Sequence, residues 1–269
     1  MDLGLAGATV VVSGGTAGMG RAAALTFATE GAKVAVLARD EGRLAHTTQE
    51  LTDAGSPDSI GIRADLTDAS QVQAAFGELS ARWRSLNVLV NAAGPVDVGI
   101  GPFQQVSDQE WIATLDIGLL SAARCVRSAL PLLRAAAWGR IVNVSAHSTR
   151  RQSPDLVAYT ASKAALTSLS KNLSQALAKD GILVNTVSPG SFLSKGMHDY
   201  LRGLPPDRRV DPDSLQDAMR VITEDFGHPA YLDRAGDPRE IGPVIAFAGS
   251  AVNSYMTGAD INVDGGSDF

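Results

Sequence analysis

The chain is poor in cysteine, in positive charge and in long apolar runs. Cys125 is the only cysteine among 269 residues, which excludes an internal disulfide and a thiolate metal cluster, and we predict no metal site. No apolar run is long enough to cross a bilayer. A formal net charge of -6 argues against nucleic acid and anionic membrane surfaces as partners. The N-terminus shows neither the basic nor the apolar region of a secretion signal, so we expect a cytoplasmic protein.

What the chain does contain is a regular alternation of short apolar strands and helices. The predicted strands cover residues 8–13, 33–38, 59–64, 87–91, 140–145, 182–187 and 260–263. The predicted helices cover residues 18–30, 40–54, 68–83, 107–136, 156–179 and 238–248. Two of them begin with a capping box, Ser107 with Glu110 and Asp237 with Glu240. This alternation indicates an α/β protein with a doubly wound parallel sheet and a ligand crevice at the carboxyl ends of the strands.

The regular pattern loosens between residues 192 and 235. This stretch is rich in proline and charge, but it also contains scattered apolar residues: Met197, Tyr200, Leu201, Met219, Ile222, Phe226 and Tyr231. We interpret it as a partly helical insertion within a single domain of residues 1–269, and as a lid over a mainly apolar substrate. A surface excursion that packs against a neighbouring subunit is the alternative.

A glycine cluster joins the first predicted strand to its helix. Its residues are Gly14, Gly15, Thr16, Gly18, Met19 and Gly20. Glycine lets the backbone approach a pyrophosphate closely, and a helix N-terminus offers free N–H donors to it. Because the cluster lies between a strand and a helix, it predicts a dinucleotide site, although glycine also makes ordinary turns.

The ends of the next strands supply further candidate contacts. At the end of the second strand Ala38 takes the place of the carboxylate that holds the ribose of NAD, and Arg39 follows it, which favours NADP(H). NAD is the alternative, in which Asp40, one residue further on, turns inward. Asp65, followed by Leu66, can bind the adenine amino group or merely cap a turn. The small residues that end the fourth strand leave room for the adenosine ribose: Asn91, Ala92, Ala93 and Gly94.

Tyr159 and Lys163 lie four residues apart in a predicted helix, and therefore on one helix face. A free phenol has a pKa near 10, which is too high for a base at neutral pH. A nearby ammonium group favours the phenolate, so we expect Lys163 to lower the pKa of Tyr159. The pair predicts a phenol that exchanges a proton with an alcohol or carbonyl; a surface tyrosine beside a solvated lysine is the alternative.

These motifs together resemble the short-chain dehydrogenase/reductases over almost the whole chain. The matching residues are Gly14, Gly18, Gly20, Asp65, Asn91, Ala92, Ala93, Gly94, Tyr159, Lys163, Pro189, Gly190 and residues 263–266. The resemblance implies a seven-stranded Rossmann sheet, a dimer or tetramer, and Tyr159 as the acid/base. It also implies that Lys163 holds the nicotinamide ribose, that Pro189 and Gly190 begin the loop over the nicotinamide, and that Ser194 binds the carboxamide.

Two positions depart from the family pattern. Ala146 stands where the family has a serine that orients the substrate oxygen, and Gly118 stands where it has an asparagine that supports a water near the lysine. Ser145, His147 and Ser148 are candidates to replace the serine, with Ser148 preferred, and we interpret His147 rather as an exposed loop histidine. We expect a water to fill the space beside Gly118.

We therefore expect an oxidoreductase that transfers a hydride between NADP(H) and a secondary alcohol or ketone, with a small-molecule substrate and a homo-oligomeric state. Arg150 and Arg151 follow the candidate serine loop and either bind an anionic substrate tail or form intramolecular ion pairs. A dinucleotide-binding protein with weak or no catalysis is the alternative, supported by Ala146 and Gly118. A dehydratase or epimerase that keeps the coenzyme is a third possibility.

Overall fold

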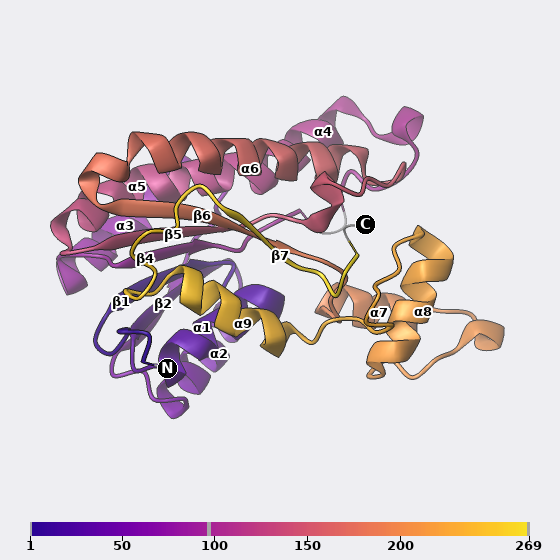
Figure 1. The fold of residues 1–269 in the computed structure, drawn as a ribbon, viewed down its shortest axis with the longest axis horizontal. Helices are drawn as coiled ribbons and strands as arrows, with labels where there is room; N and C mark the ends of the chain where they lie inside the picture. The colour runs from indigo at the N-terminus through magenta and orange to yellow at the C-terminus, as the bar shows by residue number, and fades with distance from the viewer. Residues whose placement is uncertain (1, 96–97, 268–269) are drawn as a thin grey trace.

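A single sheet of seven parallel strands organises the chain (Figure 1). The computed structural model describes residues 2–95 and 98–267. The strand order is β3-β2-β1-β4-β5-β6-β7, and every neighbouring pair is parallel. The strands are β1 (Thr9–Ser13), β2 (Lys33–Ala38), β3 (Ser59–Arg63), β4 (Val88–Asn91), β5 (Gly139–Val144), β6 (Ile182–Pro189) and β7 (Asp260–Val263). The order reverses between β1 and β4, so the predicted doubly wound Rossmann sheet is confirmed.

Helices cover both faces of the sheet (Figure 1). One layer contains α1 (Gly18–Thr29), α2 (Glu41–Asp53) and α9 (Pro238–Ala248). The other contains α3 (Ala69–Trp83), α4 (Asp108–Leu115), α5 (Ser121–Ala135) and α6 (Val157–Ala176). Right-handed crossovers between parallel strands place successive helices on these two faces.

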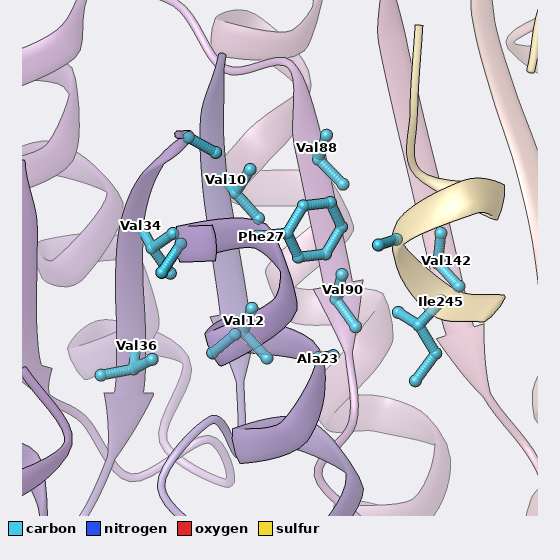
Figure 2. Packing of buried hydrophobic residues seen from close by; sticks show 14 of the residues in the cluster. Val10, Val12, Ala23, Phe27, Val34, Val36, Val88, Val90, Val142 and Ile245 are labelled. Atoms are coloured by element: carbon cyan, nitrogen blue, oxygen red, sulfur yellow. The ribbon is translucent and has the colours of Figure 1, made fainter. Parts of the chain in front are cut away.

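The two cores follow from the alternation of side chains along each strand. Val10 and Val12 point to the side of the sheet that α1 and α9 cover. Phe27 of α1 and Ile245 of α9 pack against this face (Figure 2). Val11 points to the opposite side, into the core that α3 and α5 cover. A strand that is buried on both faces reads as a continuous apolar run, which is why β1 is recognisable in the sequence.

Both predicted capping boxes are present. The Ser107 hydroxyl accepts from the backbone N–H of Glu110, and Asp237 caps α9.

Cys125 lies in the α3 and α5 core with no exposed surface, and burial raises the pKa of its thiol to about 12. Cys125 is therefore a residue of the core.

The predicted helix 107–136 is helical without a break from Asp108 to Ala135, but its hydrogen-bond pattern changes within it. A π-helical segment, Asp116–Leu120, separates α4 from α5. Gly118 lies in the middle of this segment and is buried. Single π-helical turns within α-helices are frequent at functional sites, and no periodicity of apolar residues distinguishes one from an ordinary helical turn.

The insertion 192–235 forms two helices, α7 (Lys195–Arg202) and α8 (Leu215–Phe226), beside the sheet (Figure 1). Backbone hydrogen bonds between Phe192 and Gly236 and their neighbours close its base. Its apolar residues form a separate cluster: Leu193, Leu201, Leu204, Ala218, Met219, Val221, Ile222, Ala230 and Ala235. The insertion therefore has its own small core.

Candidate active site at the carboxyl ends of the strands

The carboxyl ends of the central strands are joined by a buried row of polar side chains. Asn91 Nδ2 donates to Asn143 Oδ1 at 2.8 Å, and Asn143 Nδ2 donates to Ser170 Oγ at 2.8 Å. Ser13 Oγ donates to Asn91 Oδ1 at 3.3 Å. These contacts fix β1, β4, β5 and α6 relative to one another. The Asn91 side chain, a predicted cofactor contact, thus connects strands.

The glycine turn between β1 and α1 is shaped by backbone contacts. Gly14 has a φ of +72°, and a Cβ there would lie 2.8 Å from the backbone nitrogen of Ala93. A Cβ at Gly20 would lie 2.3 Å from the carbonyl oxygen of Gly14. Both glycines are therefore needed for close packing.

The open side of the same turn faces away from these contacts. Gly18 has a φ of +51°, and no described atom lies within 4 Å of its Cβ position. Among the described residues no side chain caps the start of α1, so its first N–H groups remain available. Thr16, Gly18 and Met19 are partly exposed. These residues fit a bound pyrophosphate.

At the end of β2 the two neighbouring charged residues differ in their surroundings. Asp40 caps α2 by accepting from the backbone N–H of Arg43 at 2.9 Å. Asp40 therefore does not turn toward a ribose. Arg39 is exposed, and within residues 2–95 and 98–267 it forms no ion pair. Its charge contributes to the lowered pKa of Asp65.

Asp65 caps the turn that follows β3. Its Oδ1 accepts from the backbone N–H and the hydroxyl of Thr67, at 2.9 and 2.7 Å. These hydrogen bonds are the main cause of the lowered pKa of Asp65. The same oxygen takes both bonds, so the carboxylate caps this turn. Leu66 beside it is buried.

Lys163 connects α6 to the ends of two strands. Its Nζ donates to the carbonyl oxygen of Val144, the last residue of β5, at 2.9 Å. A Cβ at Gly94 would lie 3.0 Å from the same nitrogen. Gly94 therefore leaves the room that Lys163 occupies, which connects the Asn91–Gly94 motif to the Tyr-x-x-x-Lys motif in space.

The pKa values of the pair are governed by burial. Burial raises the pKa of Tyr159 to about 12 and lowers the pKa of Lys163 to about 8. Burial disfavours the charged form of each group. The expected lowering of the tyrosine pKa by Lys163 is absent from these shifts, because desolvation is the dominant effect. Tyr159 is thus a neutral phenol at neutral pH.

The three candidate replacements for the missing serine hydroxyl have different partners. Ser145 Oγ lies 3.1 Å from the carbonyl oxygen of Lys163 and 2.8 Å from Thr167 Oγ1, so it is turned to α6. His147 Nδ1 lies 3.2 Å from the carbonyl oxygen of Pro189, and His147 is buried, not exposed. Ser148 is 2% exposed, and its Oγ has no partner among the residues described. Ser148 alone of the three has an uncommitted hydroxyl.

Gly118 does not leave the space that the sequence suggested. A Cβ at this position would lie 2.4 Å from Ser162 Oγ and 3.4 Å from Pro95. Ser162, which donates to the carbonyl oxygen of Tyr159 at 2.7 Å, fills the gap beside the helix. The expectation of open space beside Gly118 is wrong, because Ser162 packs closely there, and the water expected near it stays a prediction.

The loop after β6 is held by the C-terminal strand. Gly190 N donates to the carbonyl oxygen of Val263 at 2.9 Å, and a Cβ at Gly190 would lie 2.6 Å from Asp264 Cα. Ser194 caps α7 by accepting from the backbone N–H of Met197 at 3.3 Å. Pro189 and Gly190 thus lie at the end of β6 and close to the end of β7, and the Ser194 hydroxyl is used for capping.

Arg150 and Arg151 form intramolecular contacts. Arg150 pairs with Asp260 at 3.2 Å, and Arg151 donates to the carbonyl oxygens of Ser267 and Gly227 at 3.2 and 3.3 Å. These contacts support intramolecular pairing and not an anionic substrate tail.

His228 is a polar residue near the site that the sequence did not reveal. It is 5% exposed, and its ring lies edge-on to His147, with ring centroids 5.3 Å apart. No local pattern distinguishes it from a loop histidine.

Over the described part of the chain no helix is long and apolar enough to cross a membrane, and no cluster of three metal-ligating side chains occurs.

Comparison with known proteins agrees with this geometry. Residues 8–203 match the family model described as short chain dehydrogenase. The chain is 31% identical to the uncharacterized oxidoreductase YvrD of Bacillus subtilis, covering 99% of this chain and 98% of YvrD. It is 32% identical to 3-oxoacyl-(acyl-carrier-protein) reductase FabG of Staphylococcus aureus, covering 96% of this chain and 97% of FabG.

A solved structure extends the likeness to three dimensions. L-sorbose reductase from Gluconobacter frateurii, complexed with NADPH and L-sorbose, superposes with a TM-score of 0.90 at 26% identity, covering 100% of this chain and 99% of that one. The turn, the strand ends and the Tyr-x-x-x-Lys helix occur together in the order that the sequence gives. The chain therefore belongs to the short-chain dehydrogenase family, whose members are NAD(P)-dependent oxidoreductases.

Proposed function

We propose that this protein reduces a ketone to a secondary alcohol, reversibly, with NADP(H) as coenzyme and Tyr159 as the acid/base. The observation that carries the proposal is the position of Lys163, whose Nζ lies 2.9 Å from the end of β5 and against Gly94 at the end of β4. NADPH, when bound, supplies a hydride to the carbonyl carbon. Tyr159, four residues before Lys163 on α6, supplies the proton to the carbonyl oxygen.

The protonation state of Tyr159 supports the direction of reduction. A phenol with a pKa of about 12 holds its proton at neutral pH and can donate it to the oxygen as negative charge develops there. Lys163, with a pKa of about 8, is mainly an ammonium at neutral pH and stabilises the phenolate that remains. Solvent then returns the proton to the phenolate.

Ser148 is the hydroxyl that replaces the serine lost at Ala146. Its Oγ is buried and, in the described part of the chain, not hydrogen-bonded. An unpaired buried hydroxyl costs about 1–3 kcal/mol, so a carbonyl oxygen that accepts from it gains a preorganised donor.

Arg39 supports NADP(H) over NAD(H). It is exposed at the end of β2, whereas Asp40 is committed to capping α2. A guanidinium group there matches a 2′-phosphate in charge and geometry. The complex of L-sorbose reductase with NADPH agrees with this preference. Within the proposed dinucleotide site we also place Thr16, Gly18, Met19, Asp65, Ala92, Ala93, Pro189 and Gly190.

The insertion 192–235 serves as a lid on a single domain formed by residues 1–269. Its own apolar cluster lets it move as a unit, and the paired segments at Phe192 and Gly236 form its base. The cytoplasmic location and the homodimeric or homotetrameric state stay predictions.

The experiment follows NADPH oxidation by absorbance with a panel of ketones. Tyr159→Phe is expected to lower kcat/KM by about 10²–10⁴-fold, and Ser148→Ala by about 10²–10³-fold. Ser145→Ala is the matched control, because its hydroxyl bonds to α6; it is expected to lower the free energy of unfolding by about 1 kcal/mol and turnover less than tenfold. Full activity in Tyr159→Phe would refute the mechanism, and full activity in Ser148→Ala would remove Ser148 from it.

A further inference from the structure

His147 lies where three segments of the chain meet. It belongs to the loop between β5 and α6, its Nδ1 donates to the carbonyl oxygen of Pro189 at the end of β6, and its ring lies edge-on to His228 in the insertion. The ring planes are inclined at 86°. Because Pro189 precedes the nicotinamide loop, this meeting point lies beside the proposed reaction centre.

Two buried polar atoms flank His147 and are not paired within residues 2–95 and 98–267. One is Ser148 Oγ, on the next residue, and the other is His228 Nδ1. Ser148 is 2% exposed and His228 is 5% exposed. Most buried polar atoms in folded proteins have a hydrogen-bond partner, and leaving one unpaired costs about 1–3 kcal/mol. Ser148 is already assigned to the substrate oxygen, which leaves His228 to be explained.

The charge state of His228 indicates the kind of group that it can bind. Burial, followed by electrostatic interactions with His147 and Arg151, lowers the pKa of His228. The imidazole is therefore neutral at neutral pH, with one N–H donor and one acceptor nitrogen. A hydroxyl group, which both donates and accepts, is the natural partner of such a ring.

The surrounding cations do not favour an anionic ligand. Arg151 donates to the backbone carbonyls of Gly227 and Ser267, and Arg150 pairs with Asp260. Recognition of a carboxylate or phosphate normally uses an open guanidinium fork. The guanidinium group of Arg151, which acts on the pKa of His228, is engaged by these two carbonyls.

The insertion also gives less support to an apolar substrate than its sequence suggested. Leu201, Met219 and Ile222 are 2–3% exposed, because they pack in the insertion's own core. Tyr200 and Tyr231 are exposed, and the Tyr200 hydroxyl is bonded to Asp225. The expectation of a mainly apolar substrate rested on these side chains. Most of the aliphatic ones pack inside the insertion, so they are not available to contact a substrate.

We infer that His228 is a specificity-determining residue that binds a hydroxyl group of the substrate, and that the substrate is an uncharged, hydroxyl-rich ketone or its polyol product. The inference deepens the proposed function and rests on it. In this arrangement Tyr159 and Ser148 bind the carbonyl oxygen, and His228 of the insertion binds a hydroxyl group of the same molecule.

The test compares two ketones of equal carbon number, a pentulose and 2-pentanone, with NADPH. The wild-type protein is expected to prefer the pentulose in kcat/KM by at least about tenfold. His228→Phe keeps the ring edge against His147 but removes both nitrogens, and is expected to reduce this preference by about 10–100-fold, mainly through the KM for the pentulose. His228→Asn, which retains a donor and an acceptor, is expected to recover part of it.

His46→Phe is the matched control, because His46 is exposed on α2, where it pairs with Glu50. It is expected to leave the ratio of the two kcat/KM values unchanged. Thermal unfolding followed by circular dichroism tests whether each variant is folded.

Three outcomes separate the inference from the proposed function. Equal turnover of both ketones, or an unchanged preference in a folded His228→Phe, would overturn the inference and leave the reductase proposal standing. If the wild type reduces neither ketone, the reductase proposal fails for these substrates, and calorimetric titration of the protein with xylitol decides the inference. Binding that His228→Phe weakens at least tenfold supports it, and absence of binding overturns it.

Discussion

The dinucleotide side and the substrate side of this protein use polar groups in opposite ways. On the dinucleotide side, the side chains of Asn91, Asp40 and Asp65 are engaged by the protein, and the open groups are mainly the backbone N–H groups at the start of α1. On the substrate side, the side chains of Ser148 and His228 are buried with unpaired atoms, as far as the described residues show.

This difference shows how one fold can keep its coenzyme and change its substrate. Backbone donors are fixed by the turn itself and do not depend on side-chain identity. Unpaired side chains in loops are costly in the free protein, but each one can be exchanged without disturbing the sheet. In the proposed function, recognition of the coenzyme therefore follows from the fold, whereas recognition of the substrate follows from a few replaceable residues.

The largest effect is expected from a variant that distorts the glycine turn on the dinucleotide side. Gly20→Ala places a Cβ 2.3 Å from the carbonyl oxygen of Gly14, so the turn must open. We expect the free energy of unfolding to fall by about 3 kcal/mol and the Kd for NADPH to rise about 100-fold. Urea unfolding and fluorescence titration with NADPH measure these changes.

The control for that variant is Gly77→Ala in α3, where no described atom lies within 4 Å of the Cβ position. A glycine in a helix interior is less stable than alanine, so this variant should gain about 0.5–1 kcal/mol. Equal effects at Gly20 and Gly77 would contradict the close-packing argument.

A smaller effect is expected from Arg39→Ala, which removes the one side chain on the dinucleotide side that we assign to recognition by charge. We expect the KM for NADPH to rise about 10–100-fold, because the variant loses a charged hydrogen bond to the coenzyme, and we expect little change in the KM for NADH. Steady-state kinetics with each coenzyme measures the ratio. Arg220→Ala in α8, where Arg220 pairs with Asp217, should leave it unchanged. A preference for NADH in the wild type would count against NADP(H).

The pH dependence of the pair on α6 gives a more gradual effect. The pKa of Lys163 is lowered to about 8 by burial, so kcat/KM for reduction should stay level below pH 8 and fall up to about tenfold per pH unit above it. Initial rates between pH 6 and 10 at saturating NADPH test this limb. A level profile up to pH 10 would show that Lys163 keeps its proton.

The same titration has a consequence for stability with a definite sign. Lys163 has a lower pKa in the folded than in the unfolded chain, whose ordinary lysine value is 10.5. Between pH 8 and 10.5 the unfolded state binds more protons, so the folded state gains stability as pH rises. The free energy of unfolding of the wild type minus that of Lys163→Met should therefore increase with pH over this range.

Much of the fold could be predicted because its signals are local. The strand β1 is a continuous apolar run, α9 begins with a capping box at Asp237, and the glycine turn lies between a strand and a helix. Each of these features depends on neighbours within a few residues. The π-helical segment at Gly118 was missed because no periodicity of apolar residues marks it, and its close neighbour Ser162 comes from a helix more than forty residues further along the chain.

The candidate site was predictable in its motifs and less so in its chemistry. The sequence placed Tyr159 and Lys163 on one helix face and ranked Ser148 above Ser145, but it could not show which hydroxyl is left without a partner among the residues described. The two hydroxyls differ because Ser145 faces Lys163 and Thr167 on α6. Likewise, the sequence predicted a lowered pKa for Tyr159, whereas burial in the folded chain raises it.

The sequence by itself determined the parallel α/β architecture, the glycine turn and the spacing of the Tyr-x-x-x-Lys pair, because periodicity and turn chemistry act over short stretches of chain. Only the tertiary structure decided which polar groups are left for a ligand. Hydrogen-bond satisfaction and desolvation depend on atoms that folding brings from distant segments, as His147 and His228 show, 81 positions apart and edge to face.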